Sequence, residues 1–261
     1  MTSTLETCAD ASARPASPSA GDTVYQEDTK QIIVWDGSAW RVYDSAGSGG
    51  AYSNSASVEF DGTNDYMQLD SELTFTGEFT FSFWIKPISG NEGFISTGSS
   101  GASGPWVDWY GSAYGNKLVV DGMGSISGAV DSMTAGSWYH AAVIRDSSNG
   151  VKAYLNGSQI GSSSSFSGTA EFEYFAARAG PATHLNGNLD EIAFWDSDQT
   201  SNLATIYNSG APADLSGLSP TNWYRMGDVN SSSGTTITDQ GSGGVDGELI
   251  NGPTYSTDVP S

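Results

Sequence analysis

The chain has 261 residues, enough for one large domain with its own core, and its 30 Asp and Glu against 9 Lys and Arg give a formal charge of −21. Because such a charge repels phosphate backbones, we expect no nucleic-acid partner. No stretch approaches the about 20 apolar residues needed to cross a bilayer, so we expect no membrane partner. The single cysteine, Cys8, excludes an intramolecular disulfide.

The first part of the chain is predicted to contain an arm, a small β unit and a linker. Residues 1–20 are rich in Ser, Ala and Pro and lack the apolar segment of a signal peptide, so we expect a flexible arm. Residues 21–44 contain short alternating strands around an Asp-Gly turn, and residues 45–53 have the Gly, Ser and Ala composition of a linker. The candidates for docking on a larger assembly are the aromatic side chains of the small unit, Tyr25, Trp35, Trp40 and Tyr43.

From residue 54 the chain has the pattern of an all-β domain, in which aromatic-rich strands alternate with tight turns. In residues 79–86, three Phe and one Ile fall on one strand face, and the other face carries Thr80, Ser82 and Trp84, which predicts a strand of a two-layer sandwich. Residues 201–208 alone have helical spacing, with Gly210 as the expected stop. Turns are expected at eight Asn-Gly or Asp-Gly pairs, which begin at Asp36, Asp61, Asp121, Asn149, Asn156, Asn186, Asp246 and Asn251.

Five blocks of this region together resemble the concanavalin A-like, laminin-G-like jelly-roll family. They occur in that family's order and approximate spacing and cover residues 56–208. The resemblance implies a two-sheet antiparallel jelly-roll sandwich, with a small N-terminal β unit and one short helix added to it here. The blocks are Val58–Met67, Phe79–Pro87, Gly136–Val143, Ala153–Gly157 and Leu185–Ile192.

Residues 220–261 resemble the segment that ordinarily precedes the Phe-Asp-Gly block in this family, as though the domain were circularly permuted. We therefore expect this segment to fold back and complete the sandwich of residues 54–261. The alternative is a truncated second repeat, but so few residues could not bury a core unaided.

Residues 21–43 are similar to short stretches found in virion structural proteins of tailed bacteriophages. This resemblance implies a virion structural protein on the virion surface, displayed on the capsid or tail as decoration or as an adhesin. Its partners would be other virion proteins and host-surface glycans, and virion symmetry is compatible with a homotrimer. The alternative is a free carbohydrate-binding lectin.

Catalysis is not expected, although the same superfamily includes glucanases that use Glu-x-Asp-x-x-Glu. The nearest approaches are residues 59–64, which end in Asn, and Glu171-Phe-Glu173, which lacks a third acid. His140 and His184 have no nucleophile beside them in the sequence, and His140 is expected to be a packed strand residue. Glycoside hydrolysis is therefore the least favoured function.

A structural Ca²⁺ is a candidate cofactor, because members of this family often hold calcium. Asp190 matches the aspartate of the family's Leu-Asp-Glu block, and strict alternation would place it on the same strand face as Ile192 and Phe194, where a buried acid needs a cation or several donors. Asp61 and Asp65 are the candidate additional ligands. The alternative is that these two residues form Asx turns and that Asp190 accepts backbone hydrogen bonds.

The candidate glycan site is an aromatic segment set among Gly and Ser. Exposed aromatic rings there could stack on a sugar while Asp108 accepts hydroxyl hydrogen bonds. The alternative is one more core strand, since aromatic residues are usually buried. The candidate residues are Trp106, Asp108, Trp109, Tyr110 and Tyr114.

Overall fold

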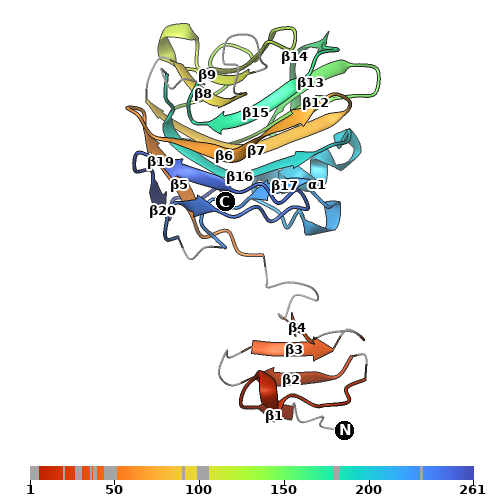
Figure 1. The fold of residues 1–261 in the computed structure, drawn as a ribbon. Helices are drawn as coiled ribbons and strands as arrows, with labels where there is room; N and C mark the ends of the chain where they lie inside the picture. The colour runs from red at the N-terminus through yellow and green to blue at the C-terminus, as the bar shows by residue number, and fades with distance from the viewer. Residues whose placement is uncertain are drawn as a thin grey trace. The chain divides into compact units, whose positions relative to one another are not determined.

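The computed structural model describes residues 6–19, 21–26, 31–35, 37, 40–43, 52–89, 92–98, 106–178, 183–229 and 232–261. The chain divides into two compact units, Met1–Ser53 and Asn54–Ser261 (Figure 1). Each unit has its own sheet structure and its own buried apolar cluster.

The first unit is a four-stranded sheet in the order β1-β2-β3-β4, in which β1 is parallel to β2 and the other pairs are antiparallel. Its strand β1 was expected to belong to a flexible arm, and the structure instead places it in the sheet because the buried Cys8 packs with Val24 and Ile33. Of the predicted linker at 45–53, only residues 52 and 53 are described, and Asp36 of the predicted turn also lies outside the described residues. The strands are β1 (Glu6–Cys8), β2 (Thr23–Gln26), β3 (Gln31–Trp35) and β4 (Trp40–Tyr43).

The second unit is a sandwich of two antiparallel sheets, which confirms the predicted fold class. Sheet I has the order β11-β10-β9-β8-β15-β6-β19-β18, and sheet II has the order β14-β13-β12-β7-β16-β5-β20 with β17 paired to β16. The strands of sheet I are β6 (Tyr66–Phe75), β8 (Glu92–Thr97), β9 (Trp106–Tyr110), β10 (Lys117–Asp121), β11 (Ile126–Ser127), β15 (Ala170–Phe175), β18 (Thr236–Ile237) and β19 (Gly247–Ile250). Those of sheet II are β5 (Ser57–Asp61), β7 (Phe79–Ser89), β12 (Tyr139–Arg145), β13 (Gly150–Leu155), β14 (Ser158–Ser165), β16 (Asn186–Trp195), β17 (Asn222–Tyr224) and β20 (Thr254–Ser256).

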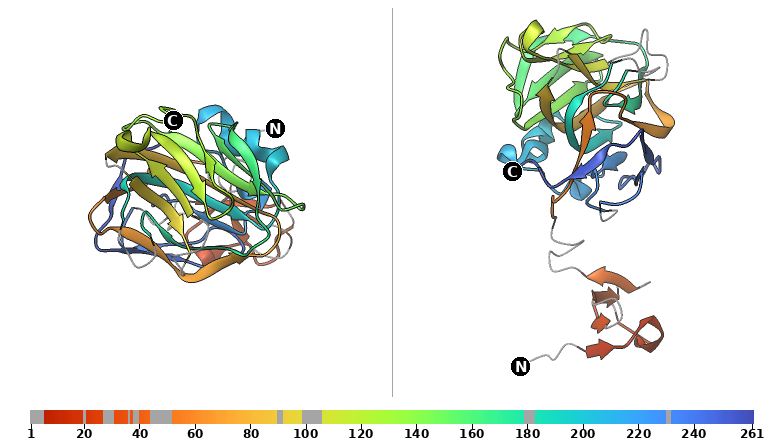
Figure 2. Two further views of the ribbon diagram at one scale, coloured as in Figure 1. Left: turned by 90° about the horizontal axis from the view of Figure 1, so that it is seen from above. Right: turned by 90° about the vertical axis from the view of Figure 1, so that its left-hand side faces the viewer.

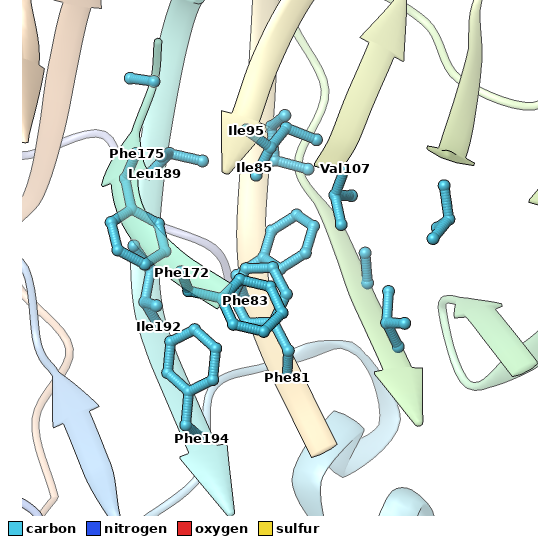
Figure 3. Packing of buried hydrophobic residues seen from close by; sticks show 14 of the residues in the cluster. Phe81, Phe83, Ile85, Ile95, Val107, Phe172, Phe175, Leu189, Ile192 and Phe194 are labelled. Carbon is cyan, nitrogen blue, oxygen red and sulfur yellow. The ribbon is translucent and has the colours of Figure 1, made fainter. Parts of the chain in front are cut away.

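The core lies between the two sheets and is rich in phenylalanine (Figure 3). On β7 the alternation predicted from the sequence holds, because Phe81, Phe83 and Ile85 point into the core. Phe81 stacks on Phe194 of the neighbouring strand β16, with ring centroids 4.6 Å apart and planes 3° apart. Phe172 from β15 of sheet I closes the cluster from the other side, with its ring centroid 5.1 Å from that of Phe81.

The Asn-Gly and Asp-Gly pairs do not all form turns. Asn156-Gly157 turns between β13 and β14 with φ of 48° and 75°, and Asn251-Gly252 turns between β19 and β20 with φ of 67° and 104°. Asn186-Gly187 lies inside β16 instead, and Asp246-Gly247 leads directly into β19. Gly187 is required there for space, since a Cβ on it would lie 2.5 Å from the carbonyl oxygen of Lys86.

The C-terminal segment supplies strands to both sheets. Strand β17 pairs with β16 and β20 with β5 in sheet II, while β19 pairs with β6 in sheet I. Figure 1 shows the blue strands β19 and β20 beside the orange strands of the start of this unit. The sandwich is therefore closed by strands from its two ends, as in the register Tyr255↔Val58, whose two residues are 197 positions apart in the sequence.

Helix α1 (Leu203–Tyr207), the one α-helix among the described residues, forms where helical spacing predicts it and lies at one side of the sandwich (Figure 2). Leu203 and Ile206 are its buried side chains, and the left-handed residue that ends it is Asn208 rather than Gly210. Short 3₁₀ turns occupy Ala11–Ala13, Ser112–Tyr114, Thr200–Asn202, Asn208–Gly210 and Ser216–Leu218. None of the helices in the described part of the chain has the length and apolarity of a membrane span.

Candidate functional site

The predicted aromatic segment is strand β9, and the pleat of that strand divides its side chains between two faces. Val107 and Trp109 point into the core, and Trp109 is only 2% exposed. Trp109 is thus a core residue and is not available to a ligand, in agreement with the alternative prediction that this segment is a core strand. Trp106, Asp108 and Tyr110 lie on the opposite face, which we call the outer face of sheet I.

Tyr110 and Tyr114 form an aromatic pair on this outer face. Their ring centroids are 5.6 Å apart and their planes are tilted by 54°. Tyr114 is 55% exposed and is the most exposed of the described aromatic side chains. A tight turn holds it in place, because the backbone N–H groups of Tyr114 and Asn116 both donate to the carbonyl of Gly111, at 2.9 and 3.0 Å. The ring is therefore presented to solvent on a short and well-fastened loop.

Trp106 and Asp108 are the other two predicted residues on this face. Trp106 is half-buried, and the guanidinium carbon of Arg178 lies 5.3 Å from the centroid of its ring. Asp108 is 1% exposed, beside Val119 of the neighbouring strand β10. The structure therefore places Asp108 below the surface, so its carboxylate is not exposed for direct contact with a ligand.

A second group of polar and aromatic side chains, not predicted as a binding site from the sequence, lies on the same outer face. The rings of Tyr66 on β6 and Tyr174 on β15 are 6.0 Å apart. The side-chain amide of Gln68 donates to Oε1 of Glu173 at 2.8 Å and to the hydroxyl of Tyr174 at 3.2 Å. Burial, and then the negative charge of Glu173, raise the pKa of Tyr174, so this phenol stays protonated at neutral pH.

The strand registers show that the two groups share one face. Tyr174 pairs with Thr97 of β8 and with Gln68 of β6, while the flanking Phe175 and Met67 are both core residues. Strand β9 is two places from β15 and three from β6 in sheet I, which separates the two groups by about 10–14 Å across the strands. Along β8, Tyr110 pairs with Glu92 and Tyr174 with Thr97, so the groups are also offset by about 16 Å along the strands. Alternation in residues 66–69 could have indicated that Tyr66 and Gln68 face outward, because they alternate with the core residues Met67 and Leu69. On β15 a bulge between Phe172 and Tyr174 interrupts the alternation, so the sequence gives no such signal for Tyr174.

The three predicted calcium ligands do not come together. Asp61 pairs with Asn186 at one end of β16, whereas Asp190 lies four residues further along that strand, about 13 Å away. Oδ1 of Asp61 accepts from the backbone N–H of Thr63 at 2.7 Å, which is the Asx turn that the sequence left open as an alternative. Oδ2 of the buried Asp65 accepts from the backbone N–H of Asp61 at 3.3 Å. Burial and the charge of Asp61 raise the pKa of Asp65.

Asp190 is fully buried, but not on the core face that strict alternation predicts. A β-bulge between Asp190 and Ala193 inserts one extra residue, Glu191, whose φ is +47°. Asp190 consequently pairs with Trp84 on the far side of sheet II from the core. Its two oxygens accept from the side-chain amide of Asn54 at 3.0 Å and from the backbone N–H of Glu191 at 2.8 Å.

These positions do not fit one calcium ion held by Asp61, Asp65 and Asp190. Among the described residues, no three His, Cys, Asp or Glu side chains are grouped in a way that could hold a metal. Calcium binding itself stays a prediction.

The histidines are placed as packed residues rather than beside an accessible nucleophile. His140 is fully buried, its Nε2 lies 2.8 Å from Oγ of Ser82, and burial lowers the pKa of its imidazole to about 3. Ser82 is itself 2% exposed, so this contact is sealed from solvent. Burial also lowers the pKa of His184, which lies near the charges of Asp61 and Asp65.

Of the predicted docking residues in the first unit, Tyr25 on β2 and Trp35 on β3 are half-buried. Trp40 and Tyr43 belong to β4, and their side chains lie outside the described residues. The two described aromatic residues are thus partly accessible on a sheet whose apolar cluster consists of Cys8, Val24 and Ile33.

Residues 61–203, more than half of the chain, match the concanavalin A-like lectin/glucanases superfamily. The chain belongs to this superfamily, and the resemblance inferred from its sequence blocks is confirmed. No curated protein matches the sequence.

Solved structures with a similar fold include a Bacteroides ovatus protein named as a candidate carbohydrate-binding protein, with a TM-score of 0.62 and 16% identity over 93% of this chain and 71% of that one. At this identity the likeness indicates the fold alone. Two other solved structures are less similar. The heptameric pentraxin of Limulus polyphemus has a TM-score of 0.48 and 19% identity over 60% of this chain and 84% of that chain. Domain 4 of an extracellular arabinanase from Geobacillus stearothermophilus has a TM-score of 0.42 and 18% identity over 57% of this chain and 76% of that chain.

Proposed function

We propose that the sandwich binds neutral glycans on the outer face of sheet I and does not cleave them. The observation that carries this proposal is the pair of aromatic groups on that face, Tyr110 with Tyr114 and Tyr66 with Tyr174. Aromatic rings beside side-chain amides and carboxylates are suited to sugars, because the ring face covers the C–H surface of a pyranose while polar neighbours bind its hydroxyl groups.

The charge of the face favours uncharged sugars. Glu171 and Glu173 lie on β15 in the middle of sheet I, and Glu248 lies opposite Gln68 on β19. With a formal charge of −21 on the chain, uronate, sialate or sulfate groups would meet repulsion at this surface. Membership of a superfamily that includes lectins supports binding, and so does the carbohydrate-binding name of the similar Bacteroides ovatus protein.

A glycan array with the full chain, followed by calorimetry on the best ligand, tests the proposal. We expect neutral glycans to bind and Tyr114→Ala to weaken binding about tenfold, near the upper value of one aromatic stacking contact. Val229→Ala is the matched control, because Val229 is also an exposed apolar side chain, at 44%. An array without bound neutral glycans would refute the proposal, as would equal affinities of Tyr114→Ala and the wild type.

The absence of catalysis is part of the same proposal. Glu171 and Glu173 flank Phe172 on one strand, and Glu173 is held by the amide of Gln68. We expect no new reducing ends when the wild-type chain is incubated with the glycan it binds. If the wild-type chain did release reducing ends and Glu173→Gln did not, the protein would be a hydrolase.

We propose further that the first unit attaches the sandwich to a virion, on the capsid or tail, where the sandwich acts as decoration or adhesin. Its separate sheet and the half-buried Tyr25 and Trp35 support this role, as does the resemblance of residues 21–43 to phage structural proteins. We expect capsid or tail genes next to the gene that encodes this protein. We also expect antibodies against the protein to label purified virions in immunogold electron microscopy. Trp35→Ala should reduce incorporation and Tyr114→Ala should not, whereas an unlabelled virion would favour a free lectin.

A further inference from the structure

A pocket of about 380 Å³ lies on the other sheet, between helix α1 and the turn that joins β13 to β14. It is independent of the outer face of sheet I, since β13 and β14 belong to sheet II. The volume is within the range of small-molecule sites, about 300–1,000 Å³. Its lining residues are Asn156, Gly157, Ser158, Thr200, Leu203, Ala204, Tyr207 and Ser209.

One wall of the pocket is the ring of Tyr207, which other rings hold in place. Trp84 stacks with it at a centroid distance of 6.2 Å and an interplanar angle of 26°, and the ring of the buried His140 lies 5.6 Å away. Gly157, at φ +75°, allows the turn to approach this ring, because a Cβ on Gly157 would lie 2.8 Å from Cδ1 of Tyr207. These contacts hold the Tyr207 ring in one position, which lowers the cost of ordering it when a ligand binds.

The rest of the lining is polar but uncharged. Ser158, Thr200 and Ser209 supply hydroxyl groups, and Asn156 supplies an amide whose Oδ1 is fixed by a hydrogen bond from the backbone N–H of His140 at 2.9 Å. No Asp, Glu, Lys, Arg or His belongs to the lining, although the chain carries 30 acidic residues. Such a lining gives no attraction for ions and several partners for hydroxyl groups.

We propose that this pocket is a second ligand site that takes one neutral sugar ring, stacked on Tyr207 and hydrogen-bonded to the surrounding hydroxyl and amide groups. With a separate site on each sheet, one molecule can hold two glycan chains or two parts of one chain. Binding at the two sites together would raise the apparent affinity for a dense glycan surface.

The test uses the full chain labelled with ¹⁵N and titrated with glucose, galactose, mannose and N-acetylglucosamine, with glycerol as a probe for nonspecific polyol binding. We expect saturable shifts of the Gly157, Thr200 and Ala204 amide signals with at least one sugar and no saturable shift with glycerol. Ala204→Phe should fill the pocket and abolish these shifts. Thr205→Phe is the matched control, because Thr205 is an exposed neighbour on α1 that does not line the pocket.

The outcomes separate this site from the proposed glycan site on sheet I. In Tyr114→Ala the pocket signals should still shift, so loss of binding at the outer face leaves this inference intact. The absence of saturable shifts with all four sugars would overturn it. Shifts that persist unchanged in Ala204→Phe, with the fold preserved in its spectrum, would place the sugar elsewhere and would also overturn it.

Discussion

The indole N–H of Trp223 donates a hydrogen bond to Oε2 of Glu191 at 2.5 Å, and this contact joins the C-terminal segment to the β-bulge of β16. Arg225 donates to the other oxygen, Oε1, at 3.2 Å, and also to Asp228 at 3.2 Å. Glu191 is 3% exposed, and its burial raises the pKa of this carboxyl to about 7 despite the opposing effect of Arg225.

This raised pKa predicts that stability falls as pH rises from about 4.5 to about 7. In that window the folded state keeps the Glu191 proton and the unfolded state, with the ordinary pKa of 4.5, releases it. Unfolding at pH 6 should therefore release about one proton from this group, and the loss of stability should level off above pH 7. Urea denaturation at a series of pH values measures the effect.

Glu191→Gln should flatten this part of the profile, because the amide does not titrate. Glu59→Gln is the control, since it removes one negative charge from an exposed position on β5. If Glu191→Gln kept the wild-type decline in the free energy of unfolding between pH 4.5 and 7, as Glu59→Gln should, other carboxyl groups would cause that decline. One of them is Asp190, because burial also raises its pKa.

Asp239→Asn should destabilise the sandwich by about 2–4 kcal/mol, because its carboxylate receives several hydrogen bonds that one amide cannot accept. Oδ1 accepts from the backbone N–H groups of Trp223 and Gly241 at 2.7 and 2.8 Å. Oδ2 accepts from the Asn222 amide and from the backbone of Gly244 and Val245. Chemical denaturation measures the change.

The matched control is Asp214→Asn, in which an exposed carboxylate accepts one backbone hydrogen bond, from Ser216 at 2.9 Å. It should alter the free energy of unfolding by less than about 0.5 kcal/mol. Equal effects of the two variants would contradict the role assigned to Asp239.

Arg145→Met should cost about 3–5 kcal/mol of stability, because the fully buried guanidinium donates to three backbone carbonyls that would lose their partner. The acceptors are the carbonyl oxygens of Gly77, Gly168 and Phe75, the last two at 2.6 and 2.8 Å. The guanidinium also lies 5.1 Å from the ring centroid of Phe79. Calorimetric unfolding tests this, with Lys152→Met on the adjacent strand β13 as a control for the lost positive charge. A similar loss in both variants would assign the effect to charge alone.

Gly187→Ala should destabilise by about 1–3 kcal/mol, because the added methyl would meet the backbone of the neighbouring strand β7. Gly217→Ala is the comparison, since a Cβ there meets nothing within 4 Å. Thermal unfolding should show a lower Tm for the first variant and an unchanged or slightly higher Tm for the second. An unchanged Tm for Gly187→Ala would mean that β7 and β16 can separate locally without cost.

Strand alternation was enough to predict the sandwich and the core face of β7, because period two is read directly from Phe79, Phe81 and Phe83. It failed at Asp190, because one inserted residue at a bulge reverses the faces and the sequence carries no clear mark of it. It also left Trp109 undecided, since burial of an aromatic side chain depends on which face of β9 meets the other sheet.

The sequence predicted the candidate glycan site only around strand β9 and missed Tyr66 and Tyr174, for a related reason. Tyr66 and Tyr174 come within 6.0 Å because β6 and β15 are neighbours, although the two residues are 108 positions apart in the sequence. No local pattern reports such a pairing. The pocket at Tyr207 similarly needs the turn at Gly157 to be placed against α1, which is a property of the tertiary fold.

The pairing of β20 with β5 also bears on how the protein is made in the cell. Strand β5 is the first of the sandwich to leave the ribosome, but its edge stays uncovered until residue 256 has been synthesised. Nascent chains must keep that edge from pairing with one another during most of translation. Slow translation or premature termination before β20 is therefore expected to yield aggregates, and chaperones that shield strand edges should raise the yield of soluble protein.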